Sequence, residues 1–141
     1  MKRHLGIDFG NKRIGIAVSD PLNIIARPVN YILNTSNIKN ELQKLLNEFE
    51  FDTIVVGMPY NLKGEKGQKA EEVEKFIGET LSDFGLNIVR WDERFTSTQA
   101  HQTLRTMNVK KSKRQSKEII DSMAAAIMLQ SYLDSRKRPQ D

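Results

Sequence analysis

The stretch HLGIDFGNKRIGIAVSD, residues 4–20, decides the fold class of this chain. Apolar residues alternate with small or polar ones on both sides of Asn11 and Lys12, which predicts two antiparallel strands joined by a tight turn. Gly10 is expected to supply backbone freedom at that turn. The first strand also carries Asp8, and an ionised carboxylate within an apolar strand needs a cation, a set of hydrogen bonds or a chemical role.

Beyond this hairpin, the sequence predicts a third strand and then strands that alternate with helices. In chain order we expect a strand at about 24–33, a helix at 36–50, a strand at 52–59, a helix at 68–83, a strand at 85–93 and helices at 96–107 and 116–135. Pro28 favours an edge position or a bulge for the third strand. This order predicts an α/β fold: a mixed five-stranded sheet, with three antiparallel leading strands and then parallel strands, flanked by helices.

Length and composition limit the class of protein. The 141 residues predict a single domain spanning 1–141, and 38% hydrophobic and 28% charged residues are ordinary for a globular protein. The chain has no Cys, which excludes disulfides and thiolate metal sites and fits a cytoplasmic location. No stretch approaches the roughly 20 apolar residues of a membrane span, and no signal peptide is recognised, so no membrane partner is expected.

Positive charge is concentrated in two segments of a chain whose net charge is +4. The stretch RTMNVKKSKRQSK, residues 105–117, holds six Lys or Arg and no acid. Such clustering favours a polyanionic partner, so we predict that a flexible basic loop at about 108–117 contacts nucleic acid, through Lys110, Lys111, Lys113 and Arg114. The alternative is a solvated loop, and the basic C-terminal tail, residues 135–141, is interpreted in that way.

Four acids occupy positions that could meet at one edge of the sheet. Functional crevices of open α/β sheets lie at the carboxyl ends of the parallel strands. Asp8 lies in the first strand, Asp92 and Glu93 end the fifth, and Asp121 lies in the last predicted helix. Asp92 and Glu93 are neighbours in an extended segment, so their side chains should point to opposite sides and only one should reach the others.

Asp121 is predicted to face the sheet. Its neighbours on the same side of a helix are Ala124, Ala125 and Met128, and such an apolar side should turn inward. The small side chains would let the helix approach closely, and the facing strands are also rich in small residues. The alternative is a helix-start acid stabilised by the helix dipole.

Converging carboxylates repel one another and raise each other's pKa, and a divalent cation removes this problem. Mg²⁺ and Mn²⁺ prefer carboxylate oxygens, and two ions about 3.5–4 Å apart can activate water and stabilise the leaving oxygen of a phosphodiester. Zinc is poorly supported, because the chain has no Cys and only His4 and His101 as histidines. The alternative is that each acid is a separate salt-bridge partner or turn residue.

Three basic residues near these acids are predicted to contact the phosphates of a nucleic acid. Lys12 and Arg13 lie at the hairpin, and Arg94 follows Glu93 before a predicted helix N-terminus. Arg94 could equally neutralise the acids. Lys63, Lys66 and Lys69, in and just after the polar segment at 60–68, are expected to be solvated; the alternative is that they also contact a nucleic-acid backbone.

Five blocks of sequence, in order and at plausible spacing, resemble the YqgF family, also called RuvX, of ribonuclease H-like proteins. They are GIDFGNKRIGIAVSD (6–20), RP (27–28), VVGMPYNLKGEKG (55–67), WDERFTS (91–97) and DSMAAAIMLQSYL (121–133), and the resemblance covers nearly the whole chain. It implies a ribonuclease H-like nuclease domain and a metal-dependent endonuclease that processes the 5′ end of pre-16S ribosomal RNA. Through the family's similarity to RuvC, the alternative is a Holliday junction resolvase acting on branched DNA.

The same resemblance implies that Asp8, Glu93 and Asp121 are the catalytic acids and the ligands of Mg²⁺ or Mn²⁺. Glu93 is preferred to Asp92 because it is the acid next to Arg94. The implied partners are structured RNA such as pre-rRNA, ribosomal particles, or branched DNA, and the chain could act as a monomer or a homodimer. Two other classes stay open: a non-catalytic nucleic-acid adaptor, and a sugar-kinase or actin-like ATPase, which would need a second such domain.

Overall fold

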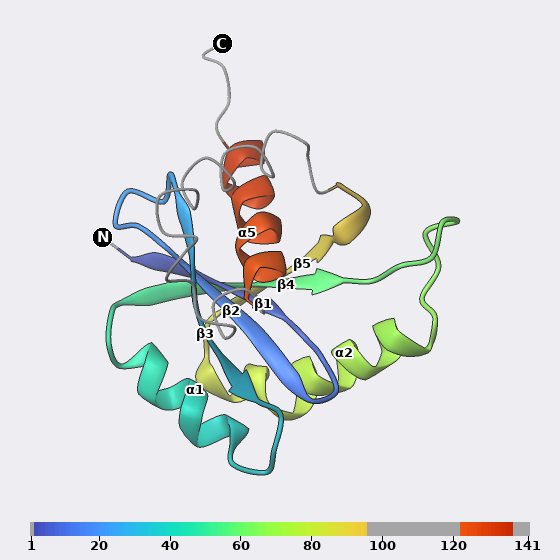
Figure 1. The fold of residues 1–141 in the computed structure, drawn as a ribbon, viewed down its shortest axis with the longest axis horizontal. Coiled ribbons are helices and arrows are strands. Elements are labelled where there is room, and N and C mark those ends of the chain that lie inside the picture. The colour runs from blue at the N-terminus through green and yellow to red at the C-terminus, as the bar shows by residue number, and fades with distance from the viewer. Residues whose placement is uncertain (1, 96–121, 137–141) are drawn as a thin grey trace, which may run out of the picture.

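The computed structural model describes residues 2–95 and 122–136, and Figure 1 shows their arrangement. In chain order the elements are β1 (Arg3–Asp8), β2 (Arg13–Ser19), β3 (Ala26–Leu33), α1 (Ile38–Leu46), β4 (Phe51–Met58), α2 (Gln68–Glu79), the 3₁₀ turn η1 (Leu81–Phe84), β5 (Asn87–Asp92), the 3₁₀ turn η2 (Glu93–Phe95) and α5 (Met123–Arg136). The predicted elements that fall within these residues are present, with shifted ends. The expected helix at 68–83 divides into α2 and η1.

Four predicted segments fall partly or wholly outside the described residues. They are the helix at 96–107, the basic loop at 108–117, the start of the helix at 116–135 and the C-terminal tail. Ser135 and Arg136, expected to open that tail, are instead the last residues of α5. Within residues 2–95 and 122–136, no helix combines the length and the apolar content that crossing a membrane requires.

The five strands form one sheet in the order β3-β2-β1-β4-β5. The first three strands pair antiparallel, whereas β1, β4 and β5 run parallel to one another. This confirms the predicted mixed sheet. Pro28 lies in the edge strand β3, one of the two positions that the sequence predicted for it. The register of β2 and β3 shifts between Ile14 and Ile16, while Pro28 itself pairs regularly with Ala17.

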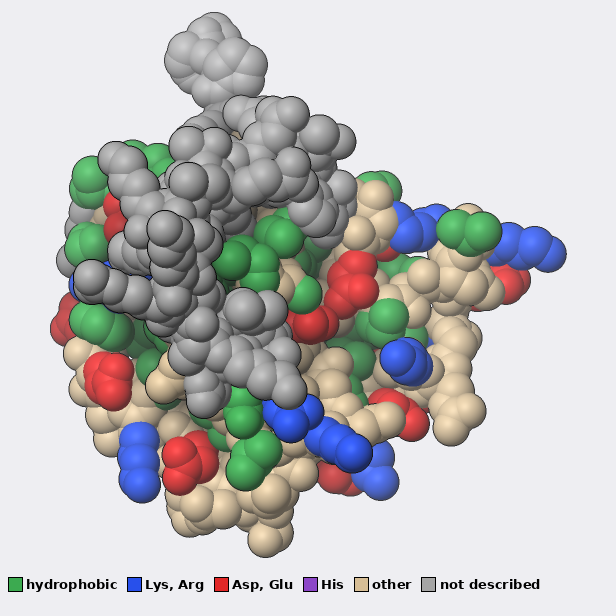
Figure 2. Space-filling view, viewed as in Figure 1, with side chains coloured by type: hydrophobic (Ala, Val, Ile, Leu, Met, Phe, Trp, Pro, Cys, Tyr) green, Lys and Arg blue, Asp and Glu red, His purple; other side chains and the backbone are tan. Residues whose placement is uncertain are grey.

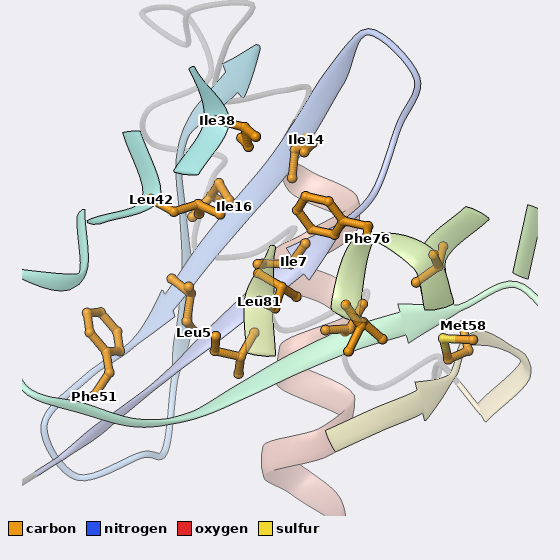
Figure 3. Packing of buried hydrophobic residues seen from close by; sticks show 14 of the residues in the cluster. Leu5, Ile7, Ile14, Ile16, Ile38, Leu42, Phe51, Met58, Phe76 and Leu81 are labelled. Atoms are coloured by element: carbon orange, nitrogen blue, oxygen red, sulfur yellow. The ribbon is translucent and has the colours of Figure 1, made fainter. Parts of the chain in front are cut away.

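One face of the sheet is packed with large apolar side chains, and α1, α2 and η1 cover it (Figure 1). Figure 3 shows Leu5, Ile7, Ile14 and Ile16 of the central hairpin pointing toward these helices. From the helices come fully or nearly buried partners, among them Ile38, Leu42, Val73, Phe76, Ile77 and Leu81. This cluster, here called the bulky face, is the larger part of the core.

The opposite face carries smaller side chains, and α5 lies against it. Its cluster contains Ala17, Ala26 and Val55 from the strands and Ala125, Ala126 and Leu129 from the helix. Gly6 of β1 leaves no room for a side chain, because a Cβ there would lie 2.9 Å from the Cβ of Leu129. We call this side of the sheet the small-residue face.

Two buried polar residues of the C-terminal segment fix α5 on this face. The hydroxyl of Ser122 accepts a 3.1 Å hydrogen bond from the backbone N–H of Ile16 in β2. The side chain of Gln130 accepts a 2.8 Å bond from the N–H of Ala26 and donates a 3.0 Å bond to the carbonyl of Ile24. Buried polar side chains need such partners, and here the partners set the position of the helix on the sheet.

The β1–β2 turn needs glycine for a different reason from the one predicted. Among the described glycines, only Gly64 and Gly85 have positive φ, so Gly10 does not use the backbone freedom expected of it. A Cβ on Gly10 would instead lie 2.3 Å from the carbonyl oxygen of Arg13. Close approach of two backbone segments, not an unusual dihedral angle, therefore demands glycine at this turn.

Candidate functional site

A polar cavity of about 220 Å³ opens where β1, β4 and β5 end, and it contains two of the predicted acids. Its wall includes Asp8 from the end of β1, Gly57 from β4, Glu93 from η2, and Lys69 and Glu72 from α2. This is the edge at which carboxyl ends of parallel strands meet, the usual position of a functional crevice in such sheets.

Glu93 reaches Asp8 because the chain turns at the end of β5. The strand ends at Asp92, and Glu93 opens the 3₁₀ turn that follows. Its side chain then lies over Gly57 of the neighbouring strand, where a Cβ would be 2.6 Å from Glu93 Oε2. The carboxyl group of Glu93 therefore packs directly against Gly57, and a larger residue at position 57 would displace it.

The two carboxyl groups form a hydrogen bond to each other, and each alters the other's ionisation. Burial and the facing charge of Asp8 raise the pKa of Glu93 to about 7. Burial also raises the pKa of Asp8, while its hydrogen bond from Glu93 and the nearby charge of Lys69 oppose that rise. Near neutral pH the two carboxyl groups therefore share a proton that is readily lost.

Asp92 has the opposite environment, although it is the next residue in the chain. Its carboxylate accepts hydrogen bonds from the side chain of Arg94, at 2.6 Å to Nη2 and 3.0 Å to Nε, and one of 2.9 Å from the Arg94 backbone N–H. These bonds hold the pKa of Asp92 below its ordinary value. The two neighbours point in different directions, as predicted, but a turn at Glu93 causes this rather than strand alternation alone.

The predicted phosphate-binding residues differ in their surroundings. Arg94 is bound to Asp92, and its Nη1 donates a 3.3 Å hydrogen bond to the carbonyl of Leu62. Lys12 is exposed at the hairpin, and so is Arg13, whose guanidinium carbon lies 5.3 Å from the centre of the Tyr31 ring. Lys110, Lys111, Lys113 and Arg114 lie outside the described residues.

Asp121, the third predicted acid, also lies outside the described residues. In the part of the chain that the structure does describe, no group of three His, Cys, Asp or Glu side chains is arranged to hold a metal ion. Of the apolar neighbours used to predict the orientation of Asp121, Ala125 and Met128 are buried, whereas Ala124 is exposed. The buried side of α5 therefore includes two of the three predicted neighbours and excludes Ala124.

Sequence reasoning did not assign Gly57, Lys69 or Glu72 to the cavity. Lys69 is exposed, as expected of a solvated lysine, but it also lines the cavity, where its charge acts on both Asp8 and Glu93. Gly57 was not singled out, although a lone glycine in the apolar strand TIVVGMP is a signal of close approach by another group. The signal for Lys69 is weaker, because it depends on where α2 begins relative to the end of β1.

A family model described as "RuvX: Holliday junction resolvase" matches residues 2–135. The chain belongs to the RuvX family. A relative from Ruminiclostridium cellulolyticum, named "Putative pre-16S rRNA nuclease", is 42% identical over 136 residues, which cover 94% of each chain. A relative of the same name from a Geobacillus species is 41% identical and covers 96% of this chain and 99% of its own. The family resemblance found in the sequence is confirmed.

Solved structures with the same fold confirm that this RuvX family member has the predicted ribonuclease H-like architecture. Thermus thermophilus RuvC in complex with a Holliday junction substrate matches with a TM-score of 0.61 and 15% identity, over 96% of this chain and 97% of that one. The fowlpox virus resolvase, also solved with Holliday junction DNA, matches with a TM-score of 0.60 and 14% identity, over 96% and 99% of the two chains. At such low sequence identities, these matches support a shared fold and nothing further.

Proposed function

We propose that this RuvX family member is a metal-dependent endonuclease that hydrolyses phosphodiester bonds in structured RNA, with the 5′ end of pre-16S ribosomal RNA as its substrate. The observation that carries the proposal is the pair of hydrogen-bonded carboxyl groups, Asp8 and Glu93, in a polar cavity at the carboxyl edge of the sheet. The name shared by the curated relatives supports the choice of RNA.

The cavity fits a divalent cation by the chemistry of its donors. Asp8 and Glu93 offer only oxygen, the ligand type that Mg²⁺ and Mn²⁺ prefer. Burial and then the facing charge of Asp8 raise the pKa of Glu93, and a cation bound between the two acids would offset both effects. The chemistry that bound divalent cations supply in such sites is polarisation of the phosphate and acidification of water.

The chain's own residues prepare this site. Gly57 allows the carboxylate of Glu93 to lie close to Asp8, and the ionised forms of both acids would hold the cation. Glu93 loses its proton near neutral pH, so cation binding should release that proton. Lys69 adds positive charge at the cavity wall, where it would attract the phosphate of a substrate.

Asp121 is proposed as the third acid of the site. It precedes Ser122, whose hydroxyl is bound to the N–H of Ile16. Ile16 follows Gly15, and Gly15 is the cross-strand partner of Asp8. The chain thus reaches residue 122 beside the strand pair that carries Asp8, which supports a shared site.

Branched DNA is the second candidate substrate, and the description of the matching family model favours it. RNA and DNA differ at the 2′-hydroxyl, and a four-way junction differs from a hairpin in its symmetry. A direct comparison of substrates therefore decides between the two candidates.

The test is cleavage of a pre-16S RNA fragment and of a synthetic Holliday junction in Mg²⁺, with wild type and the variants Asp8→Asn, Glu93→Gln and Asp121→Asn. We expect wild type to cleave the RNA, and each variant to lose more than about a hundredfold in turnover while still binding it. Asp83→Asn is the matched control, because Asp83 is exposed and pairs with Lys39 away from the cavity.

Three outcomes would change the proposal. Equal cleavage by wild type and Asp8→Asn would end the catalytic assignment. Cleavage of the junction alone would establish the resolvase activity instead. Binding of RNA by wild type, with no turnover in any divalent cation, would identify a non-catalytic adaptor.

A further inference from the structure

A short arm between β4 and α2, residues 60–67, presents an apolar side chain at its tip. Leu62 is 94% exposed, more than any other large hydrophobic residue that the structure describes. Figure 2 shows this arm at the right edge of the molecule, with a hydrophobic side chain between basic ones. The neighbouring lysines of the arm are Lys63 and Lys66. A single exposed leucine is common on protein surfaces, so its setting must decide whether it has a role.

The arm is held in one conformation by its own hydrogen bonds. The side-chain oxygen of Asn61 accepts bonds of 2.9 Å from the N–H groups of Lys63 and Glu65. The backbone of Asn61 bonds to Glu65 at 3.0 Å and to Gly64 at 2.8 Å. Gly64 has a φ of +80°, which allows the tight turn. Leu62 therefore projects from a structured turn, not from a loose loop.

Arg94 connects this turn to the proposed active site. Its Nη1 donates to the carbonyl of Leu62 at 3.3 Å, and a Cβ on Gly64 would lie 3.1 Å from its Nη2. Arg94 directly follows Glu93, so the acid and the cation that supports the arm are adjacent in the chain. A second exposed apolar side chain lies next to Arg94. The centre of the Phe95 ring is 5.9 Å from the guanidinium carbon, and Phe95 is 62% exposed.

We propose that Leu62 inserts between neighbouring bases of the nucleic-acid substrate beside the scissile phosphate. Apolar side chains on rigid elements open base steps in this way, and positive charge next to them holds the backbone. Lys63 supplies that charge at the tip of the arm. The insertion selects substrates in which one base step next to the cleavage position opens easily. This inference rests on the proposed nuclease function, since it assigns a specificity residue to the same site.

The experiment compares wild type, Leu62→Ala and Leu62→Phe on two RNA hairpins that differ by one mismatch at the cleavage position. On the fully paired hairpin, we expect Leu62→Ala to lose about tenfold or more in kcat/KM, because the base step must be opened. On the mismatched hairpin the loss should disappear, since the step is already open. Leu62→Phe should match or exceed wild type on both, because an aromatic ring stacks on bases.

A second measurement reads the insertion without turnover. Asp8→Asn protein is titrated into the paired hairpin carrying 2-aminopurine next to the cleavage position, with and without Leu62→Ala. Unstacking should raise the fluorescence, and removing Leu62 should abolish the rise. Leu22→Ala is the matched control in both assays, since Leu22 is 61% exposed in the β2–β3 connection, at the other end of the sheet from Asp8.

The outcomes separate this inference from the proposed function. If wild type cleaves no nucleic acid, the proposed function fails, while a fluorescence rise that depends on Leu62 still supports insertion. If wild type cleaves and Leu62→Ala keeps full activity on the paired hairpin, the insertion is wrong. An equal loss on both hairpins with unchanged fluorescence also overturns it, and points to a protein partner for the arm.

Discussion

The two faces of the sheet do different work, and their side chains differ accordingly. On the bulky face, large aliphatic and aromatic residues meet α1, α2 and η1 and exclude water. On the small-residue face, alanine and glycine let α5 approach closely. Gly57, which also lacks a side chain, leaves room for the carboxyl group of Glu93. Small residues therefore allow close approach of α5 and of Glu93 on one face, whereas large residues form the main hydrophobic core on the other. Substitutions on the two faces should therefore damage different properties.

The largest effect on stability is expected on the bulky face. Leu42 of α1 is fully buried, so Leu42→Ala should lower the free energy of unfolding by about 2–5 kcal/mol, measured by denaturant titration. Turnover per folded molecule should not change, since Leu42 lies in the core away from the cavity. Leu22→Ala is the exposed counterpart, and it should stay within about 0.5 kcal/mol of wild type. A loss of turnover without a loss of stability in Leu42→Ala would contradict the division between the faces.

Gly57→Ala should reduce turnover and leave the stability nearly unchanged, the reverse of Leu42→Ala. The added Cβ would displace the end of the Glu93 side chain, which is mobile enough to move without unfolding the sheet. We expect turnover to fall about a hundredfold, the cost of misplacing a catalytic group by about 1 Å, with little change in the free energy of unfolding.

Gly78→Ala is the matched control for that substitution. A Cβ at Gly78, inside α2, meets nothing within 4 Å, so the change should raise stability by about 0.5–1 kcal/mol and leave turnover intact. Full activity in Gly57→Ala would show that catalysis does not require Glu93 to pack against Gly57.

Gly6→Ala tests whether the approach of α5 is as close as the packing indicates. The new Cβ would lie 2.9 Å from the Cβ of Leu129 and 3.3 Å from the carbonyl oxygen of Ala125, and neither group can rotate away. We expect a loss of about 1–3 kcal/mol in the free energy of unfolding, the usual cost of overpacking. An unchanged stability would mean that the helix can shift on the sheet freely.

The sheet could be predicted from the sequence because its information is local. Alternation from Leu5 to Val18 sets a period of two, and Pro28 marks an edge strand. Both signals need no knowledge of distant residues. The close packing of a helix on Gly6 could also be expected, because alanines and glycines stood on the two sides that had to meet.

The site was predicted less completely, because its details depend on pairing between distant segments. Glu93 was favoured over Asp92 only through the motif, whereas its contact with Gly57 follows from the register in which Gly57 pairs with Trp91. The turn that begins at Glu93 and the position of Lys69 beside the acids likewise need the folded chain. The assignment of Asp121 still rests on the sequence and stays a prediction.

The stability of the protein should depend on pH in opposite ways through two neighbouring acids. The pKa of Glu93 is raised from 4.5 to about 7, so the metal-free folded protein keeps a proton that the unfolded chain releases. Wild type should therefore lose stability relative to Glu93→Gln as the pH rises from 4.5 to 7, and the two should converge below pH 4.5. Thermal unfolding in a chelator measures this, and added Mg²⁺ should restore the stability of wild type above pH 7.

Asp92→Asn should show the opposite sign, because Arg94 lowers the pKa of Asp92. Its wild-type contribution is present above the ordinary pKa of an aspartate and is lost as the pH falls through the lowered value. Asp92→Asn should thus be less stable than wild type at neutral pH and equal to it in acid. If both variants shifted stability in the same direction at neutral pH, the two carboxyl groups would not occupy the contrasting surroundings that separate the metal-facing acid from the arginine-bound one.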